Sequence, residues 1–384
     1  SSRMPASVIL PSLTIPLQKL KIWLLIPHID SDDANIQYYY DFTQGIAEYT
    51  RVFEELNADW KWQPVTLKNY RRVIDEIAGS SNGQVPFIFN LCDGDEINGV
   101  PGLSVIHYLE EKGLCFSGAD PDFYTITTSK LTMKQAFDEA GVSTPKWEAI
   151  ERPDHPISGI FEKLGSPLIL KPAVSGGGSM GISIRNVVHN EAQLREQIRL
   201  MFNGYHGWNL ASGGLVVEQY IKGAEFTTLI VGSADRPAQC VAYQPVERLF
   251  HPSLPETERF LSFDRLWEFY ETESEMPGQG NFYEYAPASP ELTSKLQELT
   301  LDAYAAVGGE GYARLDIRMD KESGQLFVLE VNAQCGLSED EDHTSIGAIL
   351  RFSSKSFTQL VAEIIYDSLI KHPLLTNLTN KKVS

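Results

Sequence analysis

Cysteine is scarce in this chain of 384 residues, and the few cysteines are far apart. They form no C-x-x-C pair, no histidine stands at metal-ligand spacing from them, and their positions are Cys92, Cys115, Cys240 and Cys335. This pattern excludes a disulfide framework and does not indicate a zinc site. Unpaired thiols are typical of a reducing compartment, so we expect a cytoplasmic protein.

Long apolar runs are also absent from the sequence. The longest clean ones, such as residues 22–26, have the length of a strand and fall well short of the roughly 18 residues that cross a bilayer. We therefore expect no membrane-spanning segment.

Positive charge is in the minority, with 32 Lys and Arg residues against 51 Asp and Glu residues and a formal net charge of -19. Such a chain cannot hold a nucleic-acid backbone or an anionic membrane over a broad surface, so we expect neither partner. An anionic ligand must meet positive groups that the fold gathers locally. The hydrophobic fraction of 42% is that of a folded globular protein.

Strand-like and helix-like segments alternate along the first part of the chain. The spacing of apolar residues predicts a strand at 21–27, a helix at 39–56, a strand at 86–91 and a helix at 102–112. This alternation is typical of an α/β domain, which we expect at residues 19–119.

After residue 119 the pattern changes to α+β. The predicted elements are a helix at 130–140, strands at 146–150 and 167–171, a strand pair at 215–220 and 225–231, and a hairpin at 314–319 and 325–331. We expect two further domains, at 120–217 and 218–372. Residues 250–290 show no steady period and are interpreted as a long loop over a site.

The strand at 167–171 ends in Lys171 and leads into the most glycine-dense stretch of the chain, which contains Ser175, Gly176, Gly177, Gly178 and Ser179. Glycine lets backbone N–H groups approach phosphate oxygens closely, and a neighbouring ammonium group adds charge. The stretch matches neither the P-loop nor the Rossmann pattern. A flexible surface turn is the alternative, but a lysine at the inner end of an apolar strand favours a triphosphate site.

The predicted hairpin carries polar residues two apart on each strand. Because side chains alternate across a strand, one face is expected to hold Arg314, Asp316, Glu330 and Asn332, and the other Leu315, Ile317, Leu329 and Val331. Two carboxylates and an amide oxygen suit Mg²⁺, and an arginine beside them suits charge that develops on an oxygen. An exposed cross-strand ion pair is the alternative, and the shared register favours the metal site over it.

A third constellation follows the apolar run at 215–217. Glu218 and Glu225 bracket a strand end and can hold the adenine amine and the ribose hydroxyls, with the backbone of Tyr220 and Ile221 reading the base edge. Taken alone, this segment is interpreted as a solvated turn, so the assignment depends on the other two constellations.

In their order along the chain, these motifs resemble the ATP-grasp superfamily, specifically enzymes of the D-alanine:D-alanine ligase type. The resemblance covers roughly residues 86–365 and includes Lys130, Lys171 with the glycine-rich loop, and segments 217–227, 311–316 and 329–332. It implies a three-domain ATP-grasp fold, in which an α/β domain precedes two α+β lobes that clasp ATP, and it implies Mg²⁺ as a cofactor.

The resemblance also implies a reaction. The γ-phosphoryl group passes to a carboxylate, and an amine then attacks the acyl phosphate, so the expected partners are small amino-acid-like acids and amines. No protein nucleophile is needed, and Cys335 is expected to be dispensable.

The implied roles follow the motifs. Lys130, Lys171 and the loop from Ser175 to Ser179 would bind the phosphates, Glu218 with Tyr220 and Ile221 would bind adenine, and Glu225 would bind ribose. Asp316, Glu330 and Asn332 would bind Mg²⁺. Arg314 and the backbone N–H of Gly336 would face the reacting carbonyl, and Asp93 would lie on the substrate side.

Two departures from the family pattern stand out. The family carries a Lys-Tyr pair on a loop over the phosphates, whereas no lysine lies between Lys222 and Lys295 here. Four consecutive carboxylates at 339–342 stand where the family offers neutral donors to the acceptor's carboxylate, and Glu341 takes the place of a serine by spacing. We therefore expect a ligase with a different substrate pair, for which D-alanine is a poor acceptor.

Three alternatives stay open: a genuine D-alanine:D-alanine ligase, an ATP-grasp kinase that releases its phosphorylated product, and an ATP-binding protein without turnover. A homodimer is expected by analogy with the family only.

Overall fold

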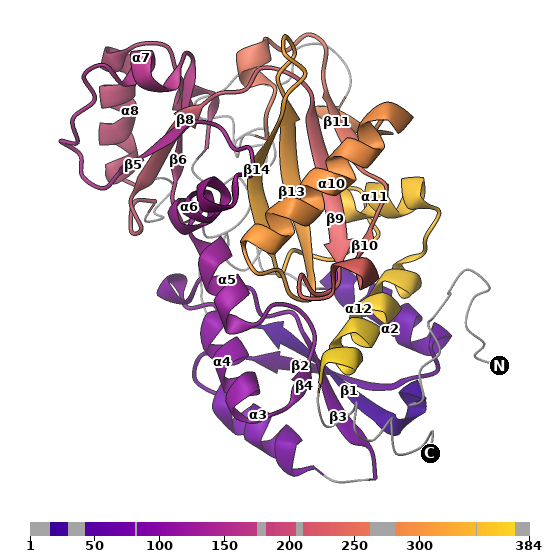
Figure 1. Cartoon of the computed structure of the whole chain (residues 1–384). Coiled ribbons are helices and arrows are strands. Elements are labelled where there is room, and N and C mark those ends of the chain that lie inside the picture. The colour runs from indigo at the N-terminus through magenta and orange to yellow at the C-terminus, as the bar shows by residue number, and fades with distance from the viewer. Residues whose placement is uncertain are drawn as a thin grey trace.

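The computed structural model describes residues 16–29, 43–80, 83–174, 182–204, 210–261, 281–342 and 344–372. These residues form three sheets with helices packed around them (Figure 1). Among the described helices, none combines the length and the apolar character that a bilayer span requires.

The N-terminal sheet is parallel, with the strand order β2-β1-β3-β4. It consists of β1 (Leu20–Pro27), β2 (Asp59–Val65), β3 (Val85–Asn90) and β4 (Cys115–Phe116), with helices α2 (Thr43–Glu55), α3 (Tyr70–Gly79) and α4 (Leu103–Glu111). Apolar residues of α2 pack with Leu24 on one face, and those of α3 and α4 pack with Leu25 on the other. The α/β prediction is confirmed. Strand β2 was not predicted, because this edge strand carries Trp, Lys and Gln rather than an apolar run.

The second sheet, called the central sheet, is antiparallel and has the order β5-β8-β6-β7. Its strands are β5 (Trp147–Ile150), β6 (Leu168–Pro172), β7 (Val187–Val188) and β8 (Leu215–Gln219), and its helices are α7 (Ile160–Leu164) and α8 (Glu191–Phe202). Helices α5 (Pro121–Thr128) and α6 (Lys130–Ala140) precede it. Helix α6 agrees with its prediction, because the Ser129 hydroxyl caps its start and Gly141, at a φ of 70°, ends it.

The third sheet, called the large sheet, is antiparallel and has the order β12-β11-β9-β13-β14, with β10 on the edge of β9. Its strands are β9 (Glu225–Val231), β10 (Val241–Ala242), β11 (Val246–Phe250), β12 (Tyr283–Pro287), β13 (Tyr312–Met319) and β14 (Leu326–Ala333). Helix α10 (Pro290–Ala306) packs on one face against Leu315 and Ile317. Helices α11 (Ser345–Ser353) and α12 (Phe357–Lys371) pack on the other face, where Leu229 lies.

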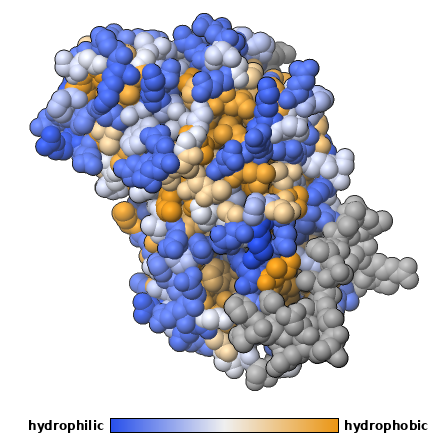
Figure 2. Space-filling view, in the orientation of Figure 1, coloured by the Kyte–Doolittle hydropathy of each residue, from blue (hydrophilic) through white to orange (hydrophobic). Residues whose placement is uncertain are grey.

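The surface of the molecule differs between these parts. Figure 2 shows hydrophilic residues over most of the visible lobe around α7 and α8, and hydrophobic residues beside α10 over the large sheet. Partly buried apolar side chains of α10, such as Leu292 and Leu299, pack against the core of the large sheet at this face.

One predicted strand pair is wrong. The segments 215–220 and 225–231 were expected to pair about a turn at Lys222 and Gly223, but β8 belongs to the central sheet and β9 to the large sheet. Gly223, at a φ of 153°, lies so close to the carbonyl of Met319 that a Cβ would overlap it. Two strands joined by a glycine have similar sequences whether they pair with each other or belong to different sheets. Here the packing of Gly223 against Met319 accompanies the second arrangement.

The predicted loop at 250–290 is wrong in part, because β12 occupies Tyr283–Pro287 and pairs with β11. Residues 262–280 lie outside the described residues. The three sheets span residues 20–116, 147–219 and 225–333, while the domain limits themselves stay a prediction.

Candidate active site

The side chains with predicted metal and oxyanion roles lie on one face of the large sheet. Arg314 and Asp316 of β13 are paired in register with Asn332 and Glu330 of β14, so all four share a face, as expected. On the opposite face, Leu315, Ile317 and Val331 join the core beneath α10. The expectation for Leu329 is wrong, because a β-bulge pairs Ile317 with Val328, which takes the core position.

The polar face extends across β9 and β11. Glu225 of β9 is paired with Arg318 of β13 on one side and with Arg248 of β11 on the other. We call this side of the large sheet the polar face. Its polar and charged residues come from β11, β9, β13 and β14 and are Glu225, Thr227, Arg248, Arg314, Asp316, Arg318, Glu330 and Asn332.

Asp316 has an electrostatic environment that favours a bound cation. Burial and the neighbouring Glu330 raise its pKa to about 6, against the attraction of Arg314, whose Nη2 lies 3.6 Å from Oδ2. Burial also opposes ionisation of Glu330, but Lys130, Lys171 and Arg314 outweigh it and lower the pKa of that carboxyl. Two crowded carboxylates that resist shared ionisation are stabilised when a cation binds between them.

The donor set fits Mg²⁺. Among the residues that the structure describes, the buried Oδ1 of Asp316 has no hydrogen-bond partner, which fits an oxygen that binds a cation. Within the described ranges no group of three or more His, Cys, Asp and Glu residues is placed to hold a metal. Mg²⁺ in phosphate-binding sites commonly uses one or two carboxylates and completes its shell with phosphate oxygens and water, so Asp316, Glu330 and Asn332 suffice.

A buried cluster of lysines faces the polar face from the central sheet and α6. Glu218 of β8 is 1% exposed and lies between Lys134 of α6, at 2.6 Å, and Lys171 of β6, at 2.5 Å. Burial would raise the pKa of Glu218, but the two lysines lower it to about 2. Lys130 lies one helical turn before Lys134, with its Nζ 3.8 Å from Glu330 Oε2.

Three charged residues of the site, Lys134, Arg248 and Arg318, were not predicted from the sequence. The first had a usable signal, since it stands four residues after Lys130 on the same helix face. The two arginines had none, because their partner Glu225 is 23 and 93 residues away. Both lower the pKa of Glu225 against the effect of burial.

Positive charge is gathered here as the acidic composition requires. The cluster contains six cationic side chains and four carboxylates among the described residues, namely Lys130, Lys134, Lys171, Arg248, Arg314 and Arg318 with Glu218, Glu225, Asp316 and Glu330. An anion that enters therefore meets a surplus of positive charge in a chain whose net charge is -19.

The backbone of Tyr220 and Ile221 is partly occupied. The Tyr220 N–H donates to the carbonyl of Pro167, and the Ile221 carbonyl accepts from Arg318 at 2.9 Å. The Tyr220 ring belongs to a small apolar cluster with Ile169, Ile182, Val187 and Phe260. Ile169 is on the same face of the central sheet as Lys171, because the two are separated by one residue on β6.

The predicted phosphate loop, Ser175 to Ser179, lies outside the described residues. Gly336 is exposed in the loop after β14, and a Cβ there would meet only Thr344, at 3.7 Å. Gln334 anchors this loop, since its side chain donates to the Asn90 carbonyl at 3.1 Å and accepts from the Ala119 N–H at 2.8 Å. Cys335 is buried and its pKa is raised to about 11, so its thiol stays protonated at neutral pH.

The predicted substrate residues, Asp93 and Glu341, are both accessible to solvent. Solvent reaches the Asp93 side chain, although surrounding protein raises its pKa to about 7 by desolvation. Glu341 is paired with Arg351 of α11 at 2.8 Å. Its acidic neighbours are also partnered, Glu339 by Arg51 at 2.6 Å and Asp340 by the Gln44 amide at 2.9 Å.

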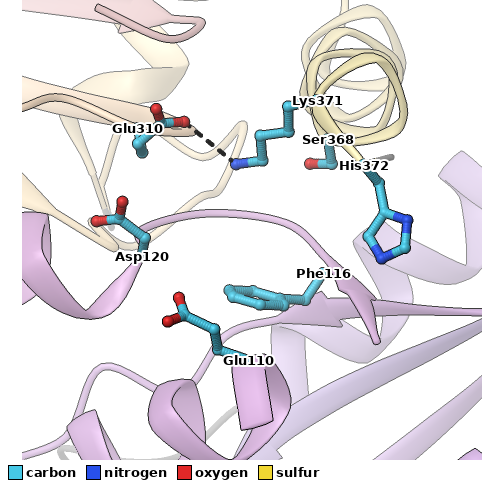
Figure 3. Close-up of a pocket in the computed structure, with 7 residues that line it drawn as sticks. All are labelled: Glu110, Phe116, Asp120, Glu310, Ser368, Lys371 and His372. Atoms are coloured by element: carbon cyan, nitrogen blue, oxygen red, sulfur yellow. Dashed lines mark ion pairs between the residues drawn. The ribbon is translucent and has the colours of Figure 1, made fainter. Parts of the chain in front are cut away.

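A separate cavity of about 220 Å³ lies between the N-terminal sheet and the end of α12 (Figure 3). It is lined by Glu110, Phe116, Asp120, Glu310, Ser368, Lys371 and His372. Lys371 is paired with Glu310 at 3.5 Å across it. None of the candidate site residues lines this cavity, so we assign it no part in the reaction.

Solved structures with the same fold are ATP-grasp ligases. The D-alanine–D-alanine ligase of Bacillus anthracis complexed with ATP superposes with a TM-score of 0.63 at 18% identity, over 94% of this chain and 99% of that one. The VanG D-Ala:D-Ser ligase of Enterococcus faecalis superposes with a TM-score of 0.65 at 16% identity, over 91% and 99%. The expected ATP-grasp fold is confirmed.

The sequence also matches the family described as D-ala D-ala ligase C-terminus, over residues 136–366. D-alanine–D-alanine ligases of Xanthomonas axonopodis pv. citri and of a Synechococcus species are 26% and 29% identical to it. The first alignment covers 73% of this chain and 78% of the relative, and the second 69% and 71%. The chain therefore belongs to the D-alanine–D-alanine ligase family of ATP-grasp enzymes, and it is an ADP-forming ligase that uses ATP and Mg²⁺.

Proposed function

We propose that this chain joins the carboxylate of one amino-acid-like molecule to the amine of another, through an acyl phosphate. The observation that carries this proposal is the convergence of Lys130 and Lys171 from one side with Asp316 and Glu330 from the other, where Lys130 comes within 3.8 Å of Glu330. Phosphate-binding cations and metal-binding carboxylates that face one another are what phosphoryl transfer needs.

On the nucleotide side, we propose that Lys130, Lys171 and residues 175–179 bind the phosphates. Glu218, with the free backbone groups of Tyr220 and Ile221, is assigned to adenine, and the apolar cluster around Tyr220 supplies a surface for the base. Glu225 is assigned to the ribose hydroxyls. Glu218 and Glu225 are both buried and held by cations, so they are ionised acceptors at neutral pH.

On the metal side, we propose that Asp316, Glu330 and Asn332 hold Mg²⁺, which would neutralise phosphate charge as the phosphoryl group is transferred. Arg314 lies beside Asp316, and its buried Nε has no hydrogen-bond partner within the described ranges. A donor of this kind is suited to an oxygen that gains charge, so we assign it to the reacting carbonyl together with the Gly336 N–H.

The acidic segment at 339–342 bears on the choice of substrates. The sequence predicts that D-alanine is repelled by the carboxylates at 339–342, yet Glu341 has Arg351 as a partner. A neutralised carboxylate repels an anion less than a free one does. We keep Asp93 and Glu341 as substrate-side residues and propose that the preferred acceptor differs from D-alanine.

The test is the release of ADP with defined pairs of acids and amines. We expect ADP and an amide product only when both substrates are present, and no turnover from Asp316→Asn. A stable phosphorylated acid would instead identify a kinase, and tight ATP binding without ADP from any pair would identify a non-catalytic protein. Turnover with D-alanine alone, at the rate of the best pair, would restore the D-alanine:D-alanine assignment.

Three further expectations, on domain limits, location and oligomeric state, belong with this proposal. We propose domains at 19–119, 120–217 and 218–372, which agree with the division of the strands into three sheets. A cytoplasmic location agrees with four cysteines that are all unpaired. A homodimer is proposed from family analogy, and a monomeric sedimentation profile would refute it.

A further inference from the structure

Arg248 occupies a position on the polar face that none of the assigned roles uses. It lies on β11 directly opposite Glu225 of β9, and Glu225 is in turn opposite Arg318 of β13. Two residues further along the same strands, Thr227 is opposite Asp316, one of the metal-side carboxylates. Arg248 therefore lies on the β11 side of Glu225, and Asp316 lies diagonally from it in the next row of the same face. The Asp316 carboxylate still acts electrostatically on the Arg248 guanidinium.

The guanidinium of Arg248 is buried but not fully used. The residue is 4% exposed, and its Nη1 lies 2.5 Å from Glu225 Oε2. Its Nε is buried and has no hydrogen-bond partner in the described part of the chain. The rings of Tyr283 and Tyr285 flank the guanidinium, with each centroid 5.7 Å from Cζ. The tyrosine rings pack against the guanidinium, and its Nε–H meets no acceptor among the described residues.

Arg318, in the same row, differs from Arg248 because its donors are bound by other groups of the protein. Besides Glu225, it donates to the carbonyls of Ile221 and Arg259, and its Cζ lies 5.0 Å from the Tyr220 ring centroid. Glu225 therefore already has one cation whose other donors are satisfied. A second buried arginine with an unsatisfied donor is costly unless a ligand supplies the missing acceptor.

Charge identifies the kind of acceptor. Burial opposes the charge of Arg248, but Tyr285, Glu225 and Asp316 outweigh it and raise the pKa of the guanidinium, which is therefore charged at every physiological pH. A charged planar group with a free N–H suits an anionic oxygen, and phosphate oxygens are bound well by arginine. Arg248 contacts Glu225, the proposed ribose ligand, and lies within electrostatic reach of Asp316, a proposed metal ligand. The anionic oxygens that a nucleotide carries between its ribose and its bound metal are those of the phosphates.

We propose that Arg248 binds the phosphates of ATP, in addition to supporting Glu225. This inference rests on the proposed function, since it takes Glu225 as the ribose ligand and Asp316 as a metal ligand. It assigns a third cation to the phosphates, beside Lys130 and Lys171. This cation lies on the large sheet, opposite the lysines of the central sheet and α6.

The test compares the binding of ATP, ADP and adenosine to the full chain by calorimetry, with Mg²⁺ present. Adenosine has the base and ribose but no phosphate, so the ratio of the ATP and adenosine dissociation constants isolates the phosphate contacts. For Arg248→Gln we expect ATP and ADP to bind about 10- to 100-fold more weakly and adenosine to change less than about threefold, as the loss of a hydrogen bond to a charged group predicts.

Arg248→Lys is the second variant, because it keeps the charge beside Glu225 and removes the Nε donor. We expect it to weaken ATP binding by less than Arg248→Gln and to leave adenosine binding unchanged. Arg318→Lys is the matched control in the same row, and it should weaken adenosine and ATP by the same factor. Thermal unfolding of each variant shows whether it is folded.

The outcomes separate the two proposals. If the wild-type chain binds neither ATP nor ADP, the proposed function is overturned together with this inference. If the wild type binds ATP and both Arg248 variants lose adenosine and ATP equally, Arg248 only positions Glu225 and this inference alone is overturned.

Discussion

Glu218 is the residue whose replacement tests the lysine cluster most directly. In Glu218→Gln, Lys134 and Lys171 would keep their positions in a buried site and lose the carboxylate that both contact, at 2.6 and 2.5 Å. Removing one member of a buried ionic group leaves unpaired charge, which typically costs about 3–5 kcal/mol. We therefore expect a large loss of stability at neutral pH, well beyond that of an ordinary surface substitution.

The pKa of Glu218 provides an independent magnitude. It falls from the ordinary 4.5 to about 2 in the folded protein, and a shift of this size corresponds to about 3 kcal/mol. Because the folded pKa is depressed, this stabilisation is present above pH 4.5 and is lost as the pH falls through about 2. Burial lowers the pKa of Lys134, which offsets part of the gain, so about 3 kcal/mol is an upper value.

The assay is urea denaturation of Glu218→Gln and of the wild type at pH 7 under identical conditions. Unfolding is followed by circular dichroism, which reports secondary structure, and by fluorescence. Glu196→Gln is the matched control, because Glu196 is paired with Arg199 at 2.6 Å with both side chains more than half exposed. Exposed pairs contribute little, so the control should unfold at the wild-type midpoint. An equal midpoint for Glu218→Gln and wild type would refute the argument that the buried pairs stabilise the fold.

Three further predictions concern catalysis and nucleotide binding. Asp316→Asn and Glu330→Gln should each abolish ADP formation while circular dichroism stays that of the wild type, and near-normal turnover in both would remove the metal assignment. Lys171→Ala should weaken ATP binding about 10-fold or more, with the loss partly masked at high Mg²⁺, and an unchanged dissociation constant would return Lys171 to a structural role beside Glu218. Cys335→Ala should retain most of its turnover, because the buried thiol has a pKa near 11 and is not a thiolate at neutral pH; a folded but inactive variant would contradict this.

Several features of the site follow from local sequence alone. Alternation along 314–319 and 325–331 predicted that Arg314, Asp316, Glu330 and Asn332 share a face, and the register of β13 and β14 confirms it. Helix α6 was predicted with its start and end, because Ser129 and Gly141 act on their immediate neighbours. Side-chain direction in strands and helix capping depend on residues only a few positions apart, so a sequence states them directly.

Tertiary structure decided what depends on distant partners. Arg248 and Arg318 contact Glu225 from 23 and 93 residues away along the chain. Arg351, which pairs with Glu341, lies on helix α11, and nothing in the acidic segment at 339–342 indicates this partner. The strands β8 and β9 were expected to pair, yet they divide between two sheets. Local propensity is similar for a hairpin and a crossover, and the choice between them is made by packing against residues such as Met319 that lie far along the chain. The sequence by itself therefore determined the residue types and faces of the site, and the fold determined which of those faces meet.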